Sequence, residues 1–248
     1  MNCFQTPRIG LVIIFLILFS QNKMLMAQIQ RKPIATFQHD NNGPGPNLIG
    51  PIVFNQGRQL LTWNGNTVKI SPINGDGAVI SFIHESQISN AKIINKGQQL
   101  LTSSRNEIVT IWPISRGEAV AVFKHENFIY GAKTINGDKQ LLTWSEDGTI
   151  KIWPISGGNA IVTIQHEKPD DGYNFAVHGV KVIDDGKQLL SWGDDGTAKI
   201  WPITGGKPTA TFQNENGSAL YGAKIINNGK QLLTWSHDKT AKIWDISD

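Results

Sequence analysis

The sequence predicts an all-β protein built from five repeated units of four strands each. One observation is a phrase, Gln-Leu-Leu followed by Thr or Ser, that occurs five times. Another is its spacing, because the first Leu of successive copies stands at positions 60, 100, 141, 189 and 232. The third is the composition: 25 Gly and 11 Pro in 248 residues, with little helical periodicity, favour short strands joined by turns.

The third unit shows how each unit is expected to divide. Its connections are two to five residues long and rich in Asn, Asp and Gly, which is typical of hairpins, and its expected strands are 130–135, 140–145, 149–155 and 159–165. Four strands every 40 to 48 residues have the period of a propeller blade and exceed that of a leucine-rich repeat. The inner strands of the five blades are expected near 47–75, 88–115, 129–156, 177–204 and 220–247.

The two ends of the repeated region complement each other. Residues 34–39 (Ile-Ala-Thr-Phe-Gln-His) match the outermost strand and turn of the fourth unit, residues 209–214, whereas the fifth unit has no such strand. If the opening strand completes the fifth unit, the result is a closed ring of five four-stranded blades without an exposed sheet edge. The alternative is an open arc that a partner or a second copy completes.

One segment carries a family resemblance. Residues 143–153, Thr-Trp-Ser-Glu-Asp-Gly-Thr-Ile-Lys-Ile-Trp, resemble the closing half of a WD repeat. His125, eighteen residues before Thr143, stands where that family's Gly-His turn places its histidine. The resemblance covers residues 34–248 and indicates a divergent, bacterial-type WD-repeat β-propeller, in which Pro follows the second Trp in three units and Asp only in the last. Rings of this family most often resemble seven-bladed propellers, which keeps the open arc as an alternative.

The first two units depart most from the pattern, and we expect them to be less regular. Ser71 replaces the strand-three Trp in the first unit, and Ser103 replaces the strand-two Trp in the second. The other units have bulky tryptophans on strand two, as the first does, where the family usually has a small residue. Because a five-bladed ring has wide gaps between blades, we expect these side chains to fill them; they are Trp63, Trp144, Trp192 and Trp235.

The better-preserved units bring together a His, a Ser or Thr, an Asp and a Trp. Such a set could supply a nucleophile, a base and an orienting carboxylate. Catalysis needs one such set, however, and not a copy in successive blades, so we expect no enzyme. In WD repeats the set resembles a buried hydrogen-bond network that ends on the strand-three Trp. The resemblance assigns this structural role to His125, Thr143, Asp147, Trp153, His166, Ser191, Asp195, Trp201, Thr234, Asp238 and Trp244.

Partner binding is expected at two variable positions of the first strand, eleven and thirteen residues before the repeated Leu. These positions differ from unit to unit, while their neighbours on the strand repeat almost unchanged. In WD-repeat propellers they resemble the residues that ring the mouth of the central channel and touch partners. Aromatic side chains are the natural anchors. The predicted partner-binding residues are Gln87, Ser89, Phe128, Tyr130, His178 and Tyr221, with contributions from the inserts Asp40–Asn47 and Lys168–Ala176.

Residues 1–27 are predicted to be a secretory signal. Residues 9–19 form an apolar run after Arg8, and eleven residues suit a signal sequence better than a membrane span, which needs about 20. Cleavage after Ala27 removes Arg8 and Lys23 from 23 basic residues and leaves one domain, 28–248, with a net charge of +1 and no sulfur. We expect a secreted or periplasmic protein; the alternative is an uncleaved N-terminal anchor.

The remaining composition excludes several functions. The basic residues are scattered, so no nucleic-acid partner is expected. The Asp pairs of the fourth unit lack the spacing of a calcium loop, and neither a metal nor another cofactor is predicted. The expected function is a monomeric scaffold for a protein partner, without membrane insertion after signal cleavage. The alternative is a small five-bladed carbohydrate-binding lectin, which would present matching polar and aromatic pairs in every blade.

Overall fold

The computed structural model describes residues 33, 35–39, 49–104, 106–115, 118–166, 175–215 and 217–247. By their contacts, residues 1–34 and 35–248 form two units, and all the strands belong to the second. The predicted signal segment and the insert Asp40–Asn47 lie outside the described residues, as does most of the insert Lys168–Ala176. No helix in the described part of the chain is long and apolar enough to cross a membrane.

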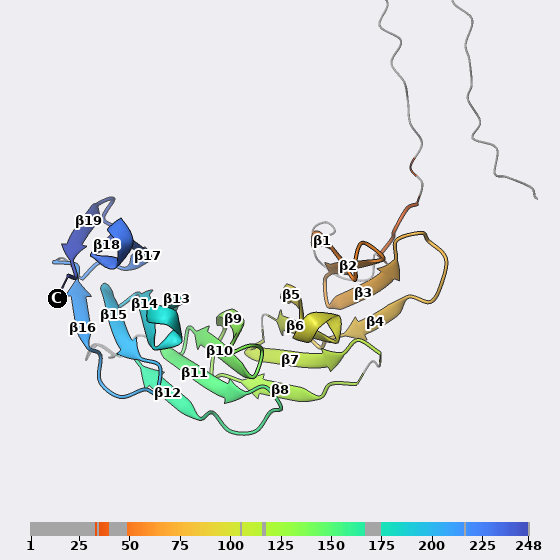
Figure 1. Cartoon of the computed structure of the whole chain (residues 1–248), viewed down its shortest axis with the longest axis horizontal. Helices are drawn as coiled ribbons and strands as arrows, with labels where there is room; N and C mark the ends of the chain where they lie inside the picture. The colour runs from red at the N-terminus through yellow and green to blue at the C-terminus, as the bar shows by residue number, and fades with distance from the viewer. Residues whose placement is uncertain are drawn as a thin grey trace, which may run out of the picture. The chain divides into compact units, whose positions relative to one another are not determined.

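The described strands form five antiparallel sheets, each made from consecutive strands (Figure 1). Four sheets have four strands and the last has three. The first two sheets consist of β1 Ile49–Phe54, β2 Gln59–Asn64, β3 Thr67–Pro72, β4 Ile80–Ile83, and β5 Ile88–Ile94, β6 Gln99–Ser104, β7 Ile108–Pro113, β8 Ala121–Lys124. The others consist of β9 Ile129–Ile135, β10 Gln140–Ser145, β11 Thr149–Pro154, β12 Val162–Gln165; β13 Val177–Ile183, β14 Gln188–Gly193, β15 Thr197–Pro202, β16 Ala210–Gln213; and β17 Leu220–Ile226, β18 Gln231–Ser236, β19 Ala241–Asp245.

The strands of the third unit lie close to their predicted positions. β9, β10 and β11 agree within one residue at each end, whereas β12 begins at Val162, three residues later than predicted. The turn before β12 is longer because Gly157 and Gly158 take φ angles of 95° and 97°, a region that glycine enters without steric cost. β11 ends at Pro154, whose missing N–H suits the end of a hydrogen-bonded ladder.

Consecutive sheets pack against each other in chain order, with β2 against β5, β6 against β9, β10 against β13 and β14 against β17. Figure 1 shows each sheet beside the one that precedes it. Three of the four strand-two tryptophans lie in these interfaces, as predicted. Trp63 and Trp192 are buried in clusters that include side chains of the following sheet, and Trp144 packs against a cluster that includes Val177 of the fourth sheet.

Residues 35–39 lie where the outer strand of a preceding sheet would lie. The His39 Nε2 atom is 2.8 Å from Thr62 Oγ1 in the first sheet. In the same way, the Nε2 atom of His125, which follows β8, is 2.7 Å from Thr143 Oγ1 in the next sheet. The opening segment therefore makes the contact expected of an outer strand with the sheet that comes after it.

The closed ring that the sequence predicts is not confirmed by the described strands, since no pairing joins the last sheet to the opening segment. The fifth sheet has three strands, and β19 pairs with β18 alone in the described part of the chain. Residues 35–39 do not pair with it. Trp235 on β18 and Ile243 on β19 are consequently 40% and 62% exposed. The number of sheets and their antiparallel strands confirm that part of the prediction. The closure of the five sheets into a ring remains a prediction.

The first two sheets keep the strand order of the third and fourth. The expected irregularity appears in the first sheet, where the register between β1 and β2 shifts between Ile49 and Ile52, at a different place from the shift in the other sheets. Ser71 pairs with Leu60 across β2 and β3, and Ser103 pairs with Val109 across β6 and β7, which are the cross-strand positions of the missing tryptophans. The replacement of tryptophan by serine at these two positions changes the side-chain packing around them, because each serine lines a cavity.

Candidate functional site

One of the two variable positions predicted to bind a partner, eleven residues before the repeated Leu, is a β-bulge residue in four of the five sheets. In the third sheet Tyr130 has no cross-strand partner, because the residues on either side of it pair with consecutive residues of β10. A bulge re-aims a side chain and often adjoins a binding site. The same bulge occurs in the second, fourth and fifth sheets, where the residues without a cross-strand partner are Ser89, His178 and Tyr221.

The start of the first strand is held in place by the turn between strands two and three of its own sheet. The Phe128 carbonyl accepts a hydrogen bond from the Glu146 N–H at 2.8 Å. The equivalent carbonyls of the fourth and fifth sheets accept from Asp194 and His237, both at 3.0 Å. These bonds fix the backbone beside each bulge, so the bulge residue has a defined direction.

The bulge residues of the third, fourth and fifth sheets, together with one residue of the turn between β18 and β19, form a continuous row of rings, which we call the aromatic row. It comprises Tyr130, His178, Tyr221 and His237. The ring centroids of Tyr130 and His178 are 5.8 Å apart, those of His178 and Tyr221 6.0 Å apart and stacked, and those of Tyr221 and His237 5.7 Å apart. The two tyrosines are 52% and 53% exposed. The row thus joins the third, fourth and fifth sheets on an accessible surface.

His178 is the fixed centre of the aromatic row. Its Nε2 lies 2.8 Å from an Asp194 carboxylate oxygen, and its Nδ1 lies 2.9 Å from the Leu220 carbonyl oxygen. Both partners only accept hydrogen bonds, so the two bonds exist together when the ring carries both protons. This pair of contacts crosses from the fourth sheet to the fifth and holds the ring plane for stacking.

A cavity of about 570 Å³ adjoins the row between the second and third sheets. Phe128, which is 49% exposed, and Tyr130 form its aromatic side. Ser89 and Ser103 form its polar side, with their hydroxyl oxygens 3.0 Å apart. The cavity exists because Ser103 stands where the third, fourth and fifth sheets have an indole.

The structure brings together most of the predicted partner-binding residues, though not all. Ser89, Phe128 and Tyr130 line the cavity, and His178 and Tyr221 continue the row, whereas Gln87 does not line the cavity. Sequence reasoning missed Asn90, Asp194 and His237. The sequence does contain a signal for Asp194 and His237. They stand at a position that varies from unit to unit in the turn between strands two and three, whereas the Asp that follows them is repeated.

The predicted structural networks form in the third and fourth sheets. His125 donates from Nδ1 to an Asp147 carboxylate oxygen at 2.8 Å, because a carboxylate only accepts, and its Nε2 accepts from the Thr143 hydroxyl at 2.7 Å. Trp153 donates to the same hydroxyl oxygen at 2.9 Å. In the fourth sheet His166, Ser191, Asp195 and Trp201 repeat this arrangement at 2.7 to 2.9 Å. The Thr143 and Ser191 side chains are fully buried, so these hydroxyls hold the sheets together.

The network keeps its carboxylates charged. Burial by itself raises the pKa of Asp147, but hydrogen bonds from His125, from Thr149 and from the Glu126 N–H outweigh it and hold the pKa well below its usual range. Burial likewise opposes ionisation of Asp195, and its histidine, threonine and lysine neighbours lower its pKa more strongly. Both carboxylates therefore act as fixed, charged hydrogen-bond acceptors for the imidazole rings of His125 and His166.

The second and fifth sheets contain partial networks. In the fifth, Trp244 donates to Thr234 Oγ1 at 2.9 Å, and Asn214 replaces the histidine and donates to Asp238 at 2.8 Å. In the second, no Asp is present, and His84 Nε2 is buried without a hydrogen-bond partner. Burial lowers the pKa of His84 to about 4, so the ring is neutral near pH 7.

Among the described residues, no three His, Cys, Asp or Glu side chains converge so as to hold a metal ion.

A protein-family model matches the last part of the chain. Residues 206–245, which include the whole fifth sheet, match the family model described as WD domain, G-beta repeat. No curated protein matches the chain. The matched sheet shares its cross-strand register with the other sheets, since a Leu of strand two faces a Trp of strand three in the second to fifth sheets.

Proposed function

We propose that this chain, a WD-repeat protein, is a non-enzymatic scaffold that binds a protein partner through the aromatic row and the adjoining cavity. The observation that carries the proposal is the row itself: rings from three sheets follow one another with centroids 5.7 to 6.0 Å apart, and the row continues into a cavity with one aromatic and one polar side. Exposed aromatic side chains beside a pocket are typical of the residues that dominate interface energies.

The geometry suits a partner segment that crosses several sheets. Each bulge presents one side chain, and these side chains differ from sheet to sheet. The surface can therefore distinguish partner segments by the residues that lie over each sheet. A lectin with one site per blade would instead repeat the same polar and aromatic pair. The cavity between the second and third sheets has no counterpart of the same composition in the described sheets, because the others contain Trp63, Trp144, Trp192 or Trp235 at the position of Ser103.

A double variant tests this surface. Phe128→Ser with Tyr130→Ser removes the aromatic side of the cavity and the end of the row. Val122→Ser is the matched control, because Val122 is a similarly exposed apolar residue on the outer strand β8. We expect crosslinking in extracts of the source cells to capture the same protein with the wild type and the control, and to lose it with the double variant, while all three proteins show the same circular dichroism.

Two outcomes would contradict the proposal. Unchanged capture by the double variant would show that the row is not the interface. Binding to a glycan array at several sites per chain, without a captured protein, would favour the lectin alternative.

We also propose that residues 34–39 close the ring in solution by pairing with β19, which gives a monomer. The support is local: residues 35–39 already contact the first sheet as an outer strand does, and β19 offers an unpaired edge beside the exposed Trp235. Closure would remove this edge, which otherwise invites association with other chains.

A disulfide distinguishes closure within one chain from completion by a second copy. In the fourth sheet Lys199 faces Thr211, and the equivalent residues of a closed fifth sheet are Lys242 and Thr36. We expect Lys242→Cys with Thr36→Cys, in a Cys3→Ser background, to form a disulfide within a monomer, as the control Lys199→Cys with Thr211→Cys must. A disulfide-linked dimer, or free thiols where the control is oxidised, would contradict closure within one chain.

We propose export as well, with cleavage after Ala27 into the periplasm or the medium. The support is the apolar run of residues 9–19 and the absence of sulfur after residue 27. Intact mass of the protein purified from its source tests this: a chain that starts at Gln28 supports it, and a retained N-terminus would indicate an anchor.

A further inference from the structure

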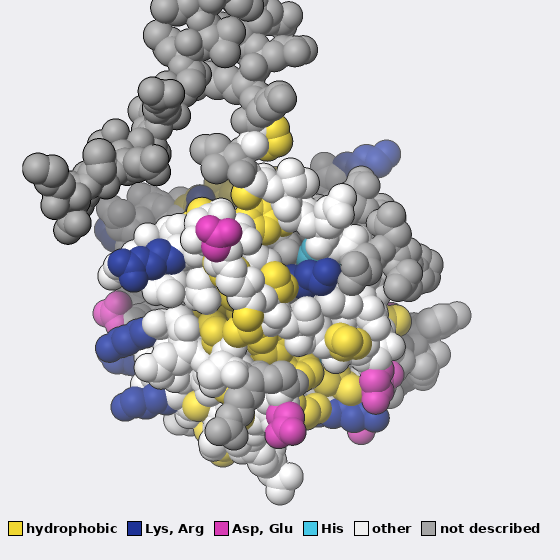
Figure 2. All heavy atoms as spheres, turned by 90° about the vertical axis from the view of Figure 1, so that its right-hand side faces the viewer, with side chains coloured by type: hydrophobic (Ala, Val, Ile, Leu, Met, Phe, Trp, Pro, Cys, Tyr) yellow, Lys and Arg dark blue, Asp and Glu magenta, His cyan; other side chains and the backbone are white. Residues whose placement is uncertain are grey.

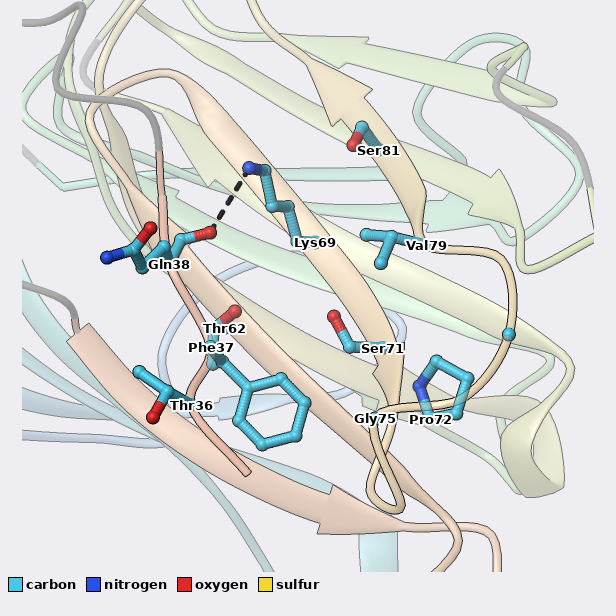
Figure 3. Close-up of a pocket in the computed structure, with 11 residues that line it drawn as sticks. Thr36, Phe37, Gln38, Thr62, Lys69, Ser71, Pro72, Gly75, Val79 and Ser81 are labelled. Carbon is cyan, nitrogen blue, oxygen red and sulfur yellow. Dashed lines mark hydrogen bonds between the residues drawn. The ribbon is translucent and has the colours of Figure 1, made fainter. Parts of the chain in front are cut away.

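A second cavity, of about 330 Å³, lies between residues 36–38 and the first sheet. Figure 3 shows Phe37, Thr62, Ser71 and Pro72 around it, with Lys69 at one side. Its residues come from the opening segment, β2, β3, the turn after β3 and β4, so it is separate from the aromatic row. Figure 2 views the right-hand side of Figure 1 and shows hydrophobic side chains over the middle of that face, with charged side chains mostly around them.

The cavity occupies the place of a missing indole. Ser71 pairs with Leu60 as Trp153 pairs with Leu141 and Trp201 with Leu189. In the second to fifth sheets a tryptophan fills this position and donates its N–H to the strand-two hydroxyl at 2.8 to 2.9 Å. A serine cannot fill that volume or reach that oxygen.

The first sheet keeps the neighbours that hold the indole in the others. Phe37 stands where Phe212 packs against Trp244 and Phe123 against Trp153, with ring centroids 5.6 to 5.8 Å apart. Thr62 supplies the strand-two hydroxyl. Its contact with His39 Nε2, at 2.8 Å, resembles the histidine contact of Thr143, in which the hydroxyl oxygen also accepts from an indole.

A lysine completes the arrangement. In the third, fourth and fifth sheets the lysine two residues before the tryptophan lies over its ring, 5.6 to 6.0 Å from the centroid. Lys69 holds this position before Ser71 and donates to the Gln38 carbonyl at 3.3 Å, which keeps its ammonium at the cavity. A cation over an aromatic face is attractive, most of all for an indole.

We propose that this cavity binds a planar aromatic molecule of indole size with one N–H donor. Phe37 contacts its edge, Thr62 accepts its N–H, and Lys69 lies over its face. Cavities left by a deleted core side chain can bind small aromatic molecules. The same chemistry belongs to free indole and to a tryptophan side chain of a peptide, and separate probes distinguish them.

Titration calorimetry on the mature protein tests the site with three probes: indole, N-methylindole and N-acetyltryptophanamide. For a ligand of this size we expect indole to bind with a dissociation constant of about 0.1 to 1 mM. N-methylindole cannot donate and should bind about three- to tenfold more weakly. Tighter binding of N-acetyltryptophanamide than of indole would indicate a peptide side chain as the source, and the reverse a free molecule.

Variants of Ser71 separate the site from general binding. Ser71→Trp should fill the cavity and abolish indole binding, while Ser71→Ala keeps the cavity and should bind as the wild type does. If Ser71→Trp does not fold, Thr62→Val serves instead, because it should reduce indole affinity to that of N-methylindole. No binding of indole at 5 mM, or equal binding by a folded Ser71→Trp variant, would overturn the proposal.

Discussion

Gly179 offers the sharpest test of the packing between sheets. It pairs with Trp192 on the next strand, and a Cβ atom at this glycine would lie 2.1 Å from the indole Cζ2. Its φ is not in the left-handed region, so Gly179→Ala introduces no backbone strain and meets only the indole. Trp192 is buried against the fifth sheet, and the indole therefore has little room to move.

The cost follows from two opposing effects. Overpacking of this kind costs about 1–3 kcal/mol, while replacing a strand glycine restores about 0.4–1 kcal/mol through the unfolded state. At about 2–4 °C per kcal/mol for a chain of this size, a net loss of about 1–2 kcal/mol lowers the Tm by about 2–8 °C. Thermal unfolding followed by circular dichroism measures it, with Asn90→Ala, which faces Ser103, as the neutral control. An unchanged Tm for Gly179→Ala would refute the reasoning.

Gly222→Ala extends the test to ring closure. Its Cβ atom would lie 1.8 Å from the Cζ2 of Trp235, which is 40% exposed in the structure. The closed ring proposed above encloses this indole, so we expect the same loss of Tm as for Gly179→Ala. A change below about 2 °C would show that the indole turns into solvent, and would contradict closure.

Three further variants probe the networks. Asp147→Asn should destabilise the protein at pH 7 more than at pH 3, because a carboxylate with a depressed pKa contributes above its ordinary pKa of about 4 and loses that contribution as the pH falls; equal losses in urea unfolding would contradict this. The wild-type protein should lose stability as the pH falls from 6.5 to about 4, because His84 binds a proton more strongly in the unfolded chain than in the folded one. His84→Asn should lose less stability over this range, and a pH profile parallel to that of the wild type would contradict the prediction. Thr143→Val should cost about 1–3 kcal/mol of unfolding free energy, with Thr143→Ser as the mild control.

Repetition made the sheets and networks predictable from sequence. Each unit has largely the same residue types at the same strand and turn positions. An interpretation of residues 140–155 can therefore be checked against the equivalent residues of the other units. Closure could not be settled in this way. The sequence indicates that residues 34–39 form an outer strand, but pairing residue 36 with residue 242 depends on the accumulated rotation between five sheets, which no local pattern encodes.

The candidate site was predictable in part. Variation at fixed positions pointed to Tyr130, His178 and Tyr221, yet it gave no reason for their exposure, because a bulge is a property of strand register. Ser103 was recognised as a departure from the repeat. Its consequence was not, since a cavity depends on what neighbouring sheets place around the absent side chain.

The two missing tryptophans differ in their surroundings, and this difference separates their roles. At Ser103 the facing residue is Asn90 where the third, fourth and fifth sheets have glycine, so this position has a polar wall that matches no indole. At Ser71 the aromatic, hydroxyl and lysine neighbours are those of the other sheets. At Ser103 both the tryptophan and its neighbour have changed, which suits the binding of a protein partner with a varied surface. At Ser71 only the tryptophan has changed, which leaves a cavity that an aromatic ring from outside the chain can occupy.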